Sequence, residues 1–470
     1  MKLFGKLAAL VCFVIFFSCT KESFTTDPSY RLTTSVDTLH FDTVFTTTGS
    51  FSQFIKLFNN NPQGIRLSSI KLAGGTSSAF RINADGITGP QVNDVEIAAN
   101  DSAYIYVTVT INPNADALPF VVRDSIEINY NGNSDWVQLE AWGQNAHFFR
   151  NKVISANEVW MDDLPYVILG PLNIKEDARL TIEKGCRIFL HADAPFVVDG
   201  TLRVNGEKDS TDRVVFTGDR LDVPFSGFPA SYPGLIFTEK SKDNVLNYAI
   251  IKNAYQGMVV AGLPPSGTKL TLNQVAIENA WEQGIWAVNT SIDATNLLVS
   301  NCGQNLLLFG GGDYNFRHCT SVSYSNAYIP HKKPVLTVLD YYVQNNVATV
   351  FPLQAVFTNS IFWGEENGFA DNEVVVDKKG SATPKVVFDH VLWRVKEVPS
   401  SIFTTIIGNP LNTDPLFDSV NTSRRFFDFR LNKKNSPAVD AGVEAGVSKD
   451  LQGMPRPQGL KPDLGAYEKQ

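Results

Sequence analysis

Alternating apolar and polar residues fill short runs in the first third of the chain, from about residue 30 to 146. Over residues 104–111, Ile and Val alternate with Tyr and Thr, which is the period-two signature of a half-buried β-strand. Similar runs lie at 126–130 and 137–141, and clusters of Asn, Gly and Pro separate them. About seven strands at this spacing predict an all-β sandwich over residues 30–147.

A longer repeat replaces this alternation from about residue 153 onward. Three segments align, over 246–254, 272–280 and 294–302, and each ends in an asparagine followed by a small residue. The marker asparagines, 26 and 22 residues apart, are Asn253, Asn279 and Asn301. This spacing predicts one solenoid coil per repeat. Because stacked strands lie ~4.8 Å apart, the asparagine at one bend can hydrogen-bond the asparagine of the next coil.

The order of features in residues 30–147 resembles the bacterial immunoglobulin-like domains related to the Hydin and abnormal-spindle type. A strand followed by paired asparagines at 54–60 and a closing strand at 137–143 stand where that family has them. The resemblance implies an immunoglobulin-like β-sandwich that acts as a spacer or an interaction surface.

Residues 153–470 resemble right-handed parallel β-helix proteins of the pectate-lyase-like superfamily. Two segments match the first coils of that family. They are Gly-Thr-Leu-Arg-Val-Asn-Gly at 200–206 and Val-Val-Phe-Thr at 214–217. The most specific match is the order of five C-terminal motifs, at 413–417, 428–431, 436–442, 450–457 and 462–468. The resemblance implies an all-β chain in which the sandwich is followed by a right-handed parallel β-helix. We expect the C-terminal motifs to form a cap over the open end of the solenoid.

The N-terminal residues 1–18 have the pattern of an export signal. Lys2 and Lys6 flank the start of an apolar stretch, residues 7–17, that is too short to cross a membrane core of ~30 Å as a helix. The text Phe-Phe-Ser-Cys that ends this segment resembles the lipobox of Bacteroidota lipoproteins.

By that resemblance Cys19 becomes the lipidated N-terminus, and residues 19–29 form a tether. Two or three acyl chains hold a protein on a membrane essentially permanently. The resemblance therefore implies a lipid anchor in the outer membrane, on its periplasmic face or at the cell surface. The alternative is an ordinary signal peptide in which Cys19 is incidental.

Composition narrows the possible partners. The formal net charge is −8 and no basic patch is interleaved with aromatic residues, so we expect no nucleic-acid partner. Three cysteines remain after the leader and Cys19, namely Cys186, Cys302 and Cys319, and we expect them to be buried free thiols. No cysteine has a Cys or His neighbour at metal-ligand spacing, so we expect neither a metal nor a cofactor.

Several polar groups could carry chemistry on a parallel β-helix. They are Asp414, Asp313 after three glycines, the acids Glu365, Glu366 and Asp371, and His331 in an insertion that also holds Asp340, Tyr341 and Tyr342. Each has a plainer structural interpretation. Asp414 belongs to the predicted C-terminal cap, Asp313 to a tight turn, the three acids to a solvated loop, and His331 to an ordinary loop. No paired aspartates accompany Asp414, and the catalytic residues stay unassigned.

Aromatic residues are the better candidates for ligand binding. Tyr255 and Trp281 both follow a coil-closing Asn-Ala pair, and Trp286 lies on the next strand. Rings that point outward would form a flat platform for sugars. Rings that point inward would form an internal ladder, which we favour because stacked aromatics are common in repeat cores.

Two functions of different class remain open. The first is a non-catalytic envelope lipoprotein that binds glycan or another surface protein. The second is a membrane-anchored polysaccharide lyase or glycoside hydrolase. An enzyme needs several convergent charged residues on neighbouring coils. The aligned coils show no such group, so the sequence favours the binding protein.

Overall fold

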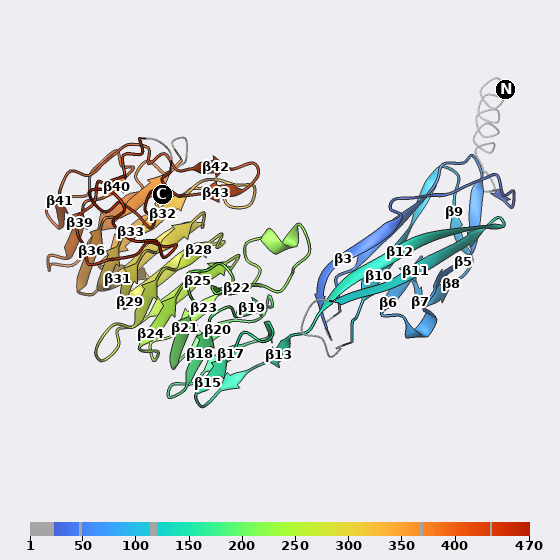
Figure 1. The fold of residues 1–470 in the computed structure, drawn as a ribbon, viewed down its shortest axis with the longest axis horizontal. Coiled ribbons are helices and arrows are strands. Elements are labelled where there is room, and N and C mark those ends of the chain that lie inside the picture. The colour runs from blue at the N-terminus through green and yellow to red at the C-terminus, as the bar shows by residue number, and fades with distance from the viewer. Residues whose placement is uncertain (1–22, 47–48, 113–119, 366–369, 433–434) are drawn as a thin grey trace, which may run out of the picture. The chain divides into compact units, whose positions relative to one another are not determined.

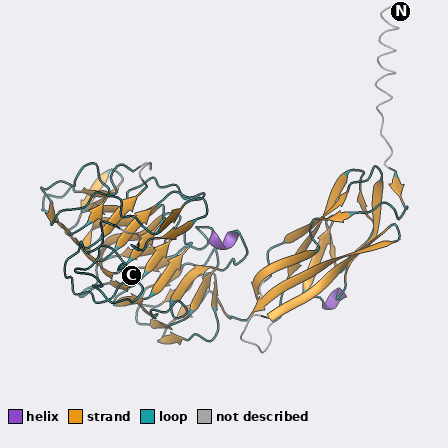
Figure 2. Ribbon diagram, turned by 45° about the horizontal axis from the view of Figure 1, so that its top comes forward, coloured by secondary structure: helices purple, strands orange, loops and turns teal. Residues whose placement is uncertain are grey.

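The computed structural model describes residues 23–46, 49–112, 120–365, 370–432 and 435–470. These residues form β-strands, loops and two short 3-10 helices, η1 (Gly75–Ser77) and η2 (Phe225–Gly227), as Figure 2 shows. The chain divides into two compact units, Met1–Asn145 and Ala146–Gln470. Among the described residues there is no helix of the length and hydropathy that a membrane span requires.

Unit 1 contains two β-sheets. The 7-stranded sheet consists of β1 (Phe24–Thr25), β5 (Gly64–Leu72), β11 (Phe120–Tyr130), β12 (Asn133–Gln144) and β3 (Thr38–Phe45), with β8 (Gln91–Val92) and β9 (Val95–Ile97) paired to β5. The 5-stranded sheet consists of β2 (Thr33–Thr34), β4 (Gln53–Asn59), β10 (Asp101–Val109), β6 (Phe80–Ala84) and β7 (Ile87–Gly89).

One apolar core lies between these two sheets. Ile105 and Val107 of β10 share it with Ile126 of β11, and all three are fully buried, whereas Tyr104 and Tyr106 are exposed. The predicted alternation is therefore confirmed. The described residues of unit 1 hold twelve strand segments instead of about seven, because short edge strands such as β2 and β8 carry no periodic run.

Unit 2 contains two long parallel sheets (Figure 1). The 10-stranded sheet consists of β13 (His147–Arg150), β16 (Tyr166–Leu169), β19 (Arg187–Leu190), β22 (Val214–Gly218), β25 (Ala249–Lys252), β28 (Ala276–Glu278), β30 (Leu298–Ser300), β32 (Thr320–Ser323), β37 (Ile361–Gly364) and β40 (Leu392–Trp393).

The 17-stranded sheet consists of β14 (Val153–Ile154), β15 (Glu158–Trp160), β17 (Leu172–Ile174), β18 (Arg179–Glu183), β20 (Phe196–Val198), β21 (Thr201–Asn205), β23 (Leu235–Phe237), β24 (Asn244–Asn247), β26 (Met258–Ala261), β27 (Leu270–Asn273), β29 (Gln283–Thr295), β31 (Gln304–Arg317), β33 (Leu336–Leu339), β36 (Leu353–Thr358), β38 (Val374–Asp377), β39 (Lys385–Asp389) and β41 (Thr404–Ile407). Two antiparallel pairs lie outside these sheets, β34 (Tyr341–Gln344) with β35 (Val347–Val350) and β42 (Ser419–Asn421) with β43 (Phe426–Asp428).

The chain passes back and forth between the two parallel sheets in a regular order. We call the two sheets together the parallel stack. In most of it, each strand of the 10-stranded sheet is followed by one long or two short strands of the 17-stranded sheet. Every strand then pairs in parallel with its equivalent in the next turn of the chain. Ile250 pairs with Ala276, which pairs with Leu298. Inward side chains of both sheets merge into one core.

The corners between the sheets carry the marker asparagines. Asn253, Asn279 and Asn301 have φ values of 66°, 57° and 52°, a left-handed conformation that Asn adopts more readily than most residues. The Asn279 side-chain amide donates a 2.8 Å hydrogen bond to Oδ1 of Asn253, which confirms the predicted contact between successive coils for this pair.

The C-terminal tail does not have the expected position. Its apolar residues pack on the outer face of the 10-stranded sheet, where they form a separate cluster with Ala276, Leu298 and Leu392. The expectation of a cap over the end of the solenoid is corrected accordingly. The physical reason is that these strands are apolar on both faces, so the outer face also needs cover.

Charged residues of the tail stabilise the tail itself. Arg456 and Glu468 form a buried ion pair of 2.9 Å, and Arg456 also donates to the backbone oxygens of Asp463 and Gly465. The Asp450 carboxylate accepts hydrogen bonds from the backbone of Met454 and other tail residues. The order of polar residues in the C-terminal motifs is therefore explained by contacts within the tail: these residues bind one another and the tail backbone.

Candidate functional site

An aromatic groove lies on the outer face of the 17-stranded sheet in unit 2. Trp286 occupies its floor, because Ile285 and Ala287 on either side of it in β29 are buried in the core and the alternation of the strand turns Trp286 outward. Phe309 of β31 lies on the next coil, where it pairs with Val288, two positions along the strand from Trp286 and on the same face. The groove encloses about 310 Å³.

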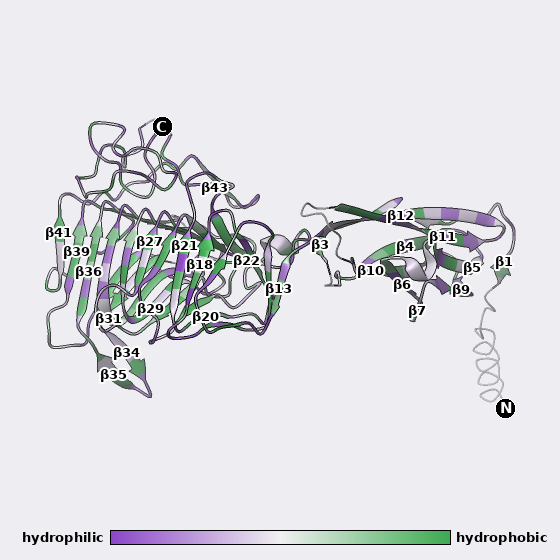
Figure 3. Ribbon diagram, turned by 60° about the horizontal axis from the view of Figure 1, so that its bottom comes forward, coloured by the Kyte–Doolittle hydropathy of each residue, from purple (hydrophilic) through white to green (hydrophobic). Residues whose placement is uncertain are grey.

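Tyr342 and Gln344 of the hairpin β34–β35 line one side of this groove. Figure 3 shows the hairpin itself, which projects from the stack near β31. The ring of Tyr342 lies 6.0 Å from that of Phe309 and 5.8 Å from that of Phe351, measured between centroids. The hairpin belongs to the insertion for which the sequence favoured an ordinary loop. Its β33 instead joins the 17-stranded sheet, and its aromatic residues converge on Trp286.

Three consecutive glycines make this convergence possible. Gly310, Gly311 and Gly312 all have positive φ, and they form a bend within β31. A Cβ on Gly311 would lie 2.6 Å from the Pro352 oxygen and 2.7 Å from Cβ of Phe351. The glycine run therefore allows the hairpin to approach the strand, and it fits the predicted turn better than an anion-binding loop.

Two polar atoms in the groove lack hydrogen-bond partners among the described residues. They are the buried Nε1 of Trp286, a donor, and the buried Oδ1 of Asn289, an acceptor. Buried polar atoms are nearly always paired in folded proteins. A ligand with hydroxyl groups can both accept from the indole and donate to the amide.

A buried lysine holds the far rim of the groove. Lys269 is fully buried, and its ammonium donates to the backbone oxygens of Glu239 and Ala261 at 3.0 and 2.6 Å and to that of Thr238. Burial lowers the pKa of Lys269 to about 8. Three carbonyl acceptors keep a charged donor in the interior and fix the backbone that lines the groove.

The other aromatic candidates lie outside the groove. Tyr255 and Trp281 are 45% and 44% exposed at successive corners of the stack. They point to solvent, and Trp286 points outward from the core into the groove, so the favoured inward ladder is wrong for these three residues. An internal ladder does exist, but Phe316, Phe357 and Phe388 form it, with centroid distances of 5.5 and 5.2 Å.

The candidate acids do not converge on one site. Asp313 and Asp371 are exposed, Asp371 pairs with Lys396, and Asp414 accepts from the backbone of Leu416 in a turn. The Ser325 hydroxyl donates to Glu365. These contacts are typical of structural or solvated acids.

The polar residues of the insertion make internal contacts. His331 is buried against Glu373 at 2.9 Å, and Glu373 also binds Arg394. The Asp340 carboxylate accepts from the backbone of Lys379 and Gly380, and Tyr341 donates to Asp377, beside which its pKa rises to about 12, chiefly through burial.

Two of the sequence candidates, Cys19 and Glu366, lie outside the described residues. Sequence reasoning found Trp286 and Tyr342 separately, but missed Phe309, Phe351 and Asn289. The paired positions of β29 and β31 were the available signal, since Trp286 and Phe309 occupy neighbouring positions on adjacent coils. The three remaining cysteines are free and buried, as predicted.

Comparison with known proteins assigns no family. No family model matches the chain, and no curated protein matches it. One similar solved structure is a family 123 glycoside hydrolase from Clostridium perfringens, described for glycolipid glycan hydrolysis, with 14% identity, a TM-score of 0.19 and coverage of 27% of this chain. This chain spans only 26% of that protein's length. Another is an ASH/PapD-like domain of human CEP192, with 11% identity, a TM-score of 0.18 and coverage of 28% of this chain and 97% of that one.

Proposed function

We propose that this protein is a lipid-anchored protein of the bacterial cell envelope that binds polysaccharide without catalysis. The parallel stack is, in this proposal, a right-handed parallel β-helix of the pectate-lyase-like type, and unit 1 is an immunoglobulin-like spacer. The observation that carries the proposal is the aromatic groove, whose four rings lie beside a buried donor and a buried acceptor that no described residue pairs.

Sugar rings bind proteins through just such pairs of features. Their C–H faces pack on aromatic rings, and their hydroxyls both donate and accept hydrogen bonds. Trp286, Phe309 and Tyr342 supply the apolar surface, while Asn289 and Gln344 supply amides at its edge. The candidate acids are dispersed and engaged elsewhere, which favours binding over hydrolysis.

Affinity measurements on polysaccharides test the groove. A glycan array with the purified protein identifies the polysaccharide. Trp286→Ala is expected to lower the affinity of the protein for that polysaccharide about tenfold, since a stacking aromatic contributes ~1–1.5 kcal/mol. Trp281→Ala is the matched control, because that ring is exposed outside the groove. An equal loss of affinity in both variants would show that the binding site is not confined to the groove and includes the corner of the parallel stack at Trp281.

Turnover assays separate the binding protein from the enzyme. Release of reducing ends or of unsaturated uronides from the bound polysaccharide would overturn the non-catalytic proposal in favour of a hydrolase or a lyase.

The anchor is tested independently of the groove. Metabolic labelling with an alkyne fatty acid is expected to mark the protein, and Cys19→Ser is expected to abolish the label and release the protein from membranes. Labelling that persists in Cys19→Ser would show that the lipid, if any, is attached elsewhere.

A further inference from the structure

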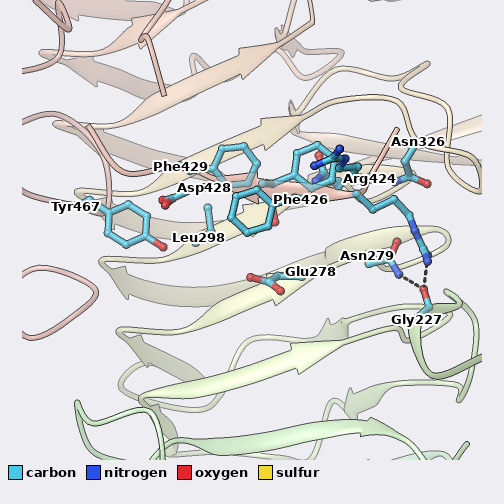
Figure 4. A pocket seen from close by; sticks show the side chains of 14 residues that line it. Gly227, Glu278, Asn279, Leu298, Asn326, Arg424, Phe426, Asp428, Phe429 and Tyr467 are labelled. Atoms are coloured by element: carbon cyan, nitrogen blue, oxygen red, sulfur yellow. Dashed lines mark hydrogen bonds between the residues drawn. The ribbon is translucent and has the colours of Figure 1, made fainter. Parts of the chain in front are cut away.

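A second cavity lies in unit 2 between the 10-stranded sheet and the hairpin β42–β43 of the tail (Figure 4). It encloses about 450 Å³, which is within the size range of small-molecule sites. Glu278, at the end of β28, lies at its floor, and Phe426 and Phe429 of the hairpin region lie across from it. Pieces of chain nearly 150 residues apart in sequence therefore face each other here.

Glu278 is not used by the fold. Its carboxyl group makes no hydrogen bond and no ion pair with any described residue, although it sits where solvent is largely removed. Burial raises its pKa, and Lys252 and Arg213 oppose that rise. Lys252 is its register partner on β25. A raised pKa favours the protonated form of a carboxyl group, which both donates and accepts hydrogen bonds.

The remaining polar groups around the cavity differ in how far they are engaged. Asn279 is bound to Asn253 and to the Gly227 oxygen, and the Asp428 carboxylate is bound to Arg430. The guanidinium of Arg424, at the rim, makes no hydrogen bond or ion pair with a described residue (Figure 4). Glu278 and Arg424 are thus two ionisable side chains at the cavity that can bind a ligand.

Charge limits the class of ligand. Lys252, Arg213 and Arg424 disfavour an ammonium group, and the carboxylate of Asp428 disfavours an anion. The aromatic rings favour a ligand with an apolar face, and the unpaired donors and acceptors favour hydroxyl groups.

We infer that this cavity binds a single neutral sugar residue, with its ring against Phe426 and its hydroxyls on Glu278 and Arg424. The inference rests on the proposed function for the class of ligand, and it adds a second site. The aromatic groove takes an extended chain, while the cavity takes one residue, such as a chain end or a free monosaccharide.

Three matched monosaccharides test the charge argument. Glucose, glucosamine and glucuronate differ only in carrying no charge, an ammonium or a carboxylate, and galactose, mannose and N-acetylglucosamine extend the neutral set. Calorimetric titration of the full chain is expected to show binding of at least one neutral sugar and weaker binding of the charged analogues. Preferential binding of glucosamine or glucuronate, or no binding of any neutral sugar, would overturn the inference.

Variants place the binding in the cavity. Glu278→Ala is expected to lower the affinity about tenfold, the loss of one or two hydrogen bonds, while Glu278→Gln keeps it within about threefold because the amide has the same shape and also forms hydrogen bonds with hydroxyl groups. Glu397→Ala, at an exposed acid, is the control. Wild-type affinity in Glu278→Ala, or equal loss in both Glu278 variants, would contradict the assignment.

The two sites fail independently. Trp286→Ala is expected to weaken polysaccharide binding and leave monosaccharide binding unchanged, and Glu278→Ala to leave a groove-bound internal segment of polysaccharide unchanged. Thermal melting of each variant tests whether unfolding is the cause. Both are expected to stay folded, because neither Trp286 Nε1 nor the Glu278 carboxyl group makes a hydrogen bond to a described residue.

Discussion

Single corner residues hold successive coils of the parallel stack together. Asn279 combines a left-handed φ of 57° with hydrogen bonds to Asn253 and to the Gly227 oxygen. Asn279→Ala removes both bonds and strains the backbone, which is expected to lower the free energy of unfolding of unit 2 by about 2–4 kcal/mol.

Asn279→Gly separates these two effects. Glycine tolerates the left-handed conformation, so its expected loss is only about 1–2 kcal/mol, from the hydrogen bonds. Denaturant titration of both variants measures the difference. Equal losses would show that backbone conformation contributes nothing at this corner.

His318 gives unit 2 a pH dependence. Its ring is buried between Asn359, which donates to Nε2, and the tail, whose Arg456 and Asp463 flank Nδ1. Burial, aided by the charge of Arg456, lowers its pKa from 6.5 to about 2. The unfolded chain therefore takes up a proton below pH ~6.5 that the folded chain refuses, so stability falls as the pH falls.

The melting temperature of unit 2 is expected to decrease between pH 7 and pH 5, and His318→Asn is expected to flatten that decrease. Asn tolerates the left-handed φ of 54° at this position and does not titrate. Scanning calorimetry at both pH values measures the slope. A slope unchanged in His318→Asn would assign the effect to other groups.

At the scale of elements, the glycine bend of β31 positions the hairpin β34–β35. Gly311→Ala is expected to displace Phe351 and Pro352 and to lower polysaccharide affinity about tenfold, because the added Cβ has no room. Gly446→Ala is the matched control, with a similar φ of 70° and no atom within 4 Å. Circular dichroism and titration of both variants measure strain and affinity, and equal affinities would show that the groove tolerates a moved hairpin.

The sequence predicted features that depend on local spacing. The alternation at Ile105 and Val107, the asparagine corners and the buried thiols all follow from one strand or from coils of equal length. The ladder of Phe316, Phe357 and Phe388 was missed because the insertion between residues 317 and 353 hides its period. The aromatic groove was missed in part for the same reason, since its rings come from three separate elements.

At the scale of the whole unit, the tail is a lateral cover. Its Phe417, Phe429 and Leu464 pack over five consecutive strands of the 10-stranded sheet, from β28 to β40. A chain that ends at residue 410 is expected to expose this apolar face, to bind the dye ANS and to aggregate. A truncated chain that stays monomeric and does not bind ANS would show that the cover is dispensable.

The lateral position of the tail also sets an order of events during synthesis. The strands β28 to β40 precede in the chain the residues that shield them, so the folding parallel stack has an exposed apolar face until the tail reaches it. A premature stop codon before Arg424 would therefore cause aggregation, and it would also remove the tail residues that line the second cavity. Newly made chains have their greatest need of a chaperone at that last stage.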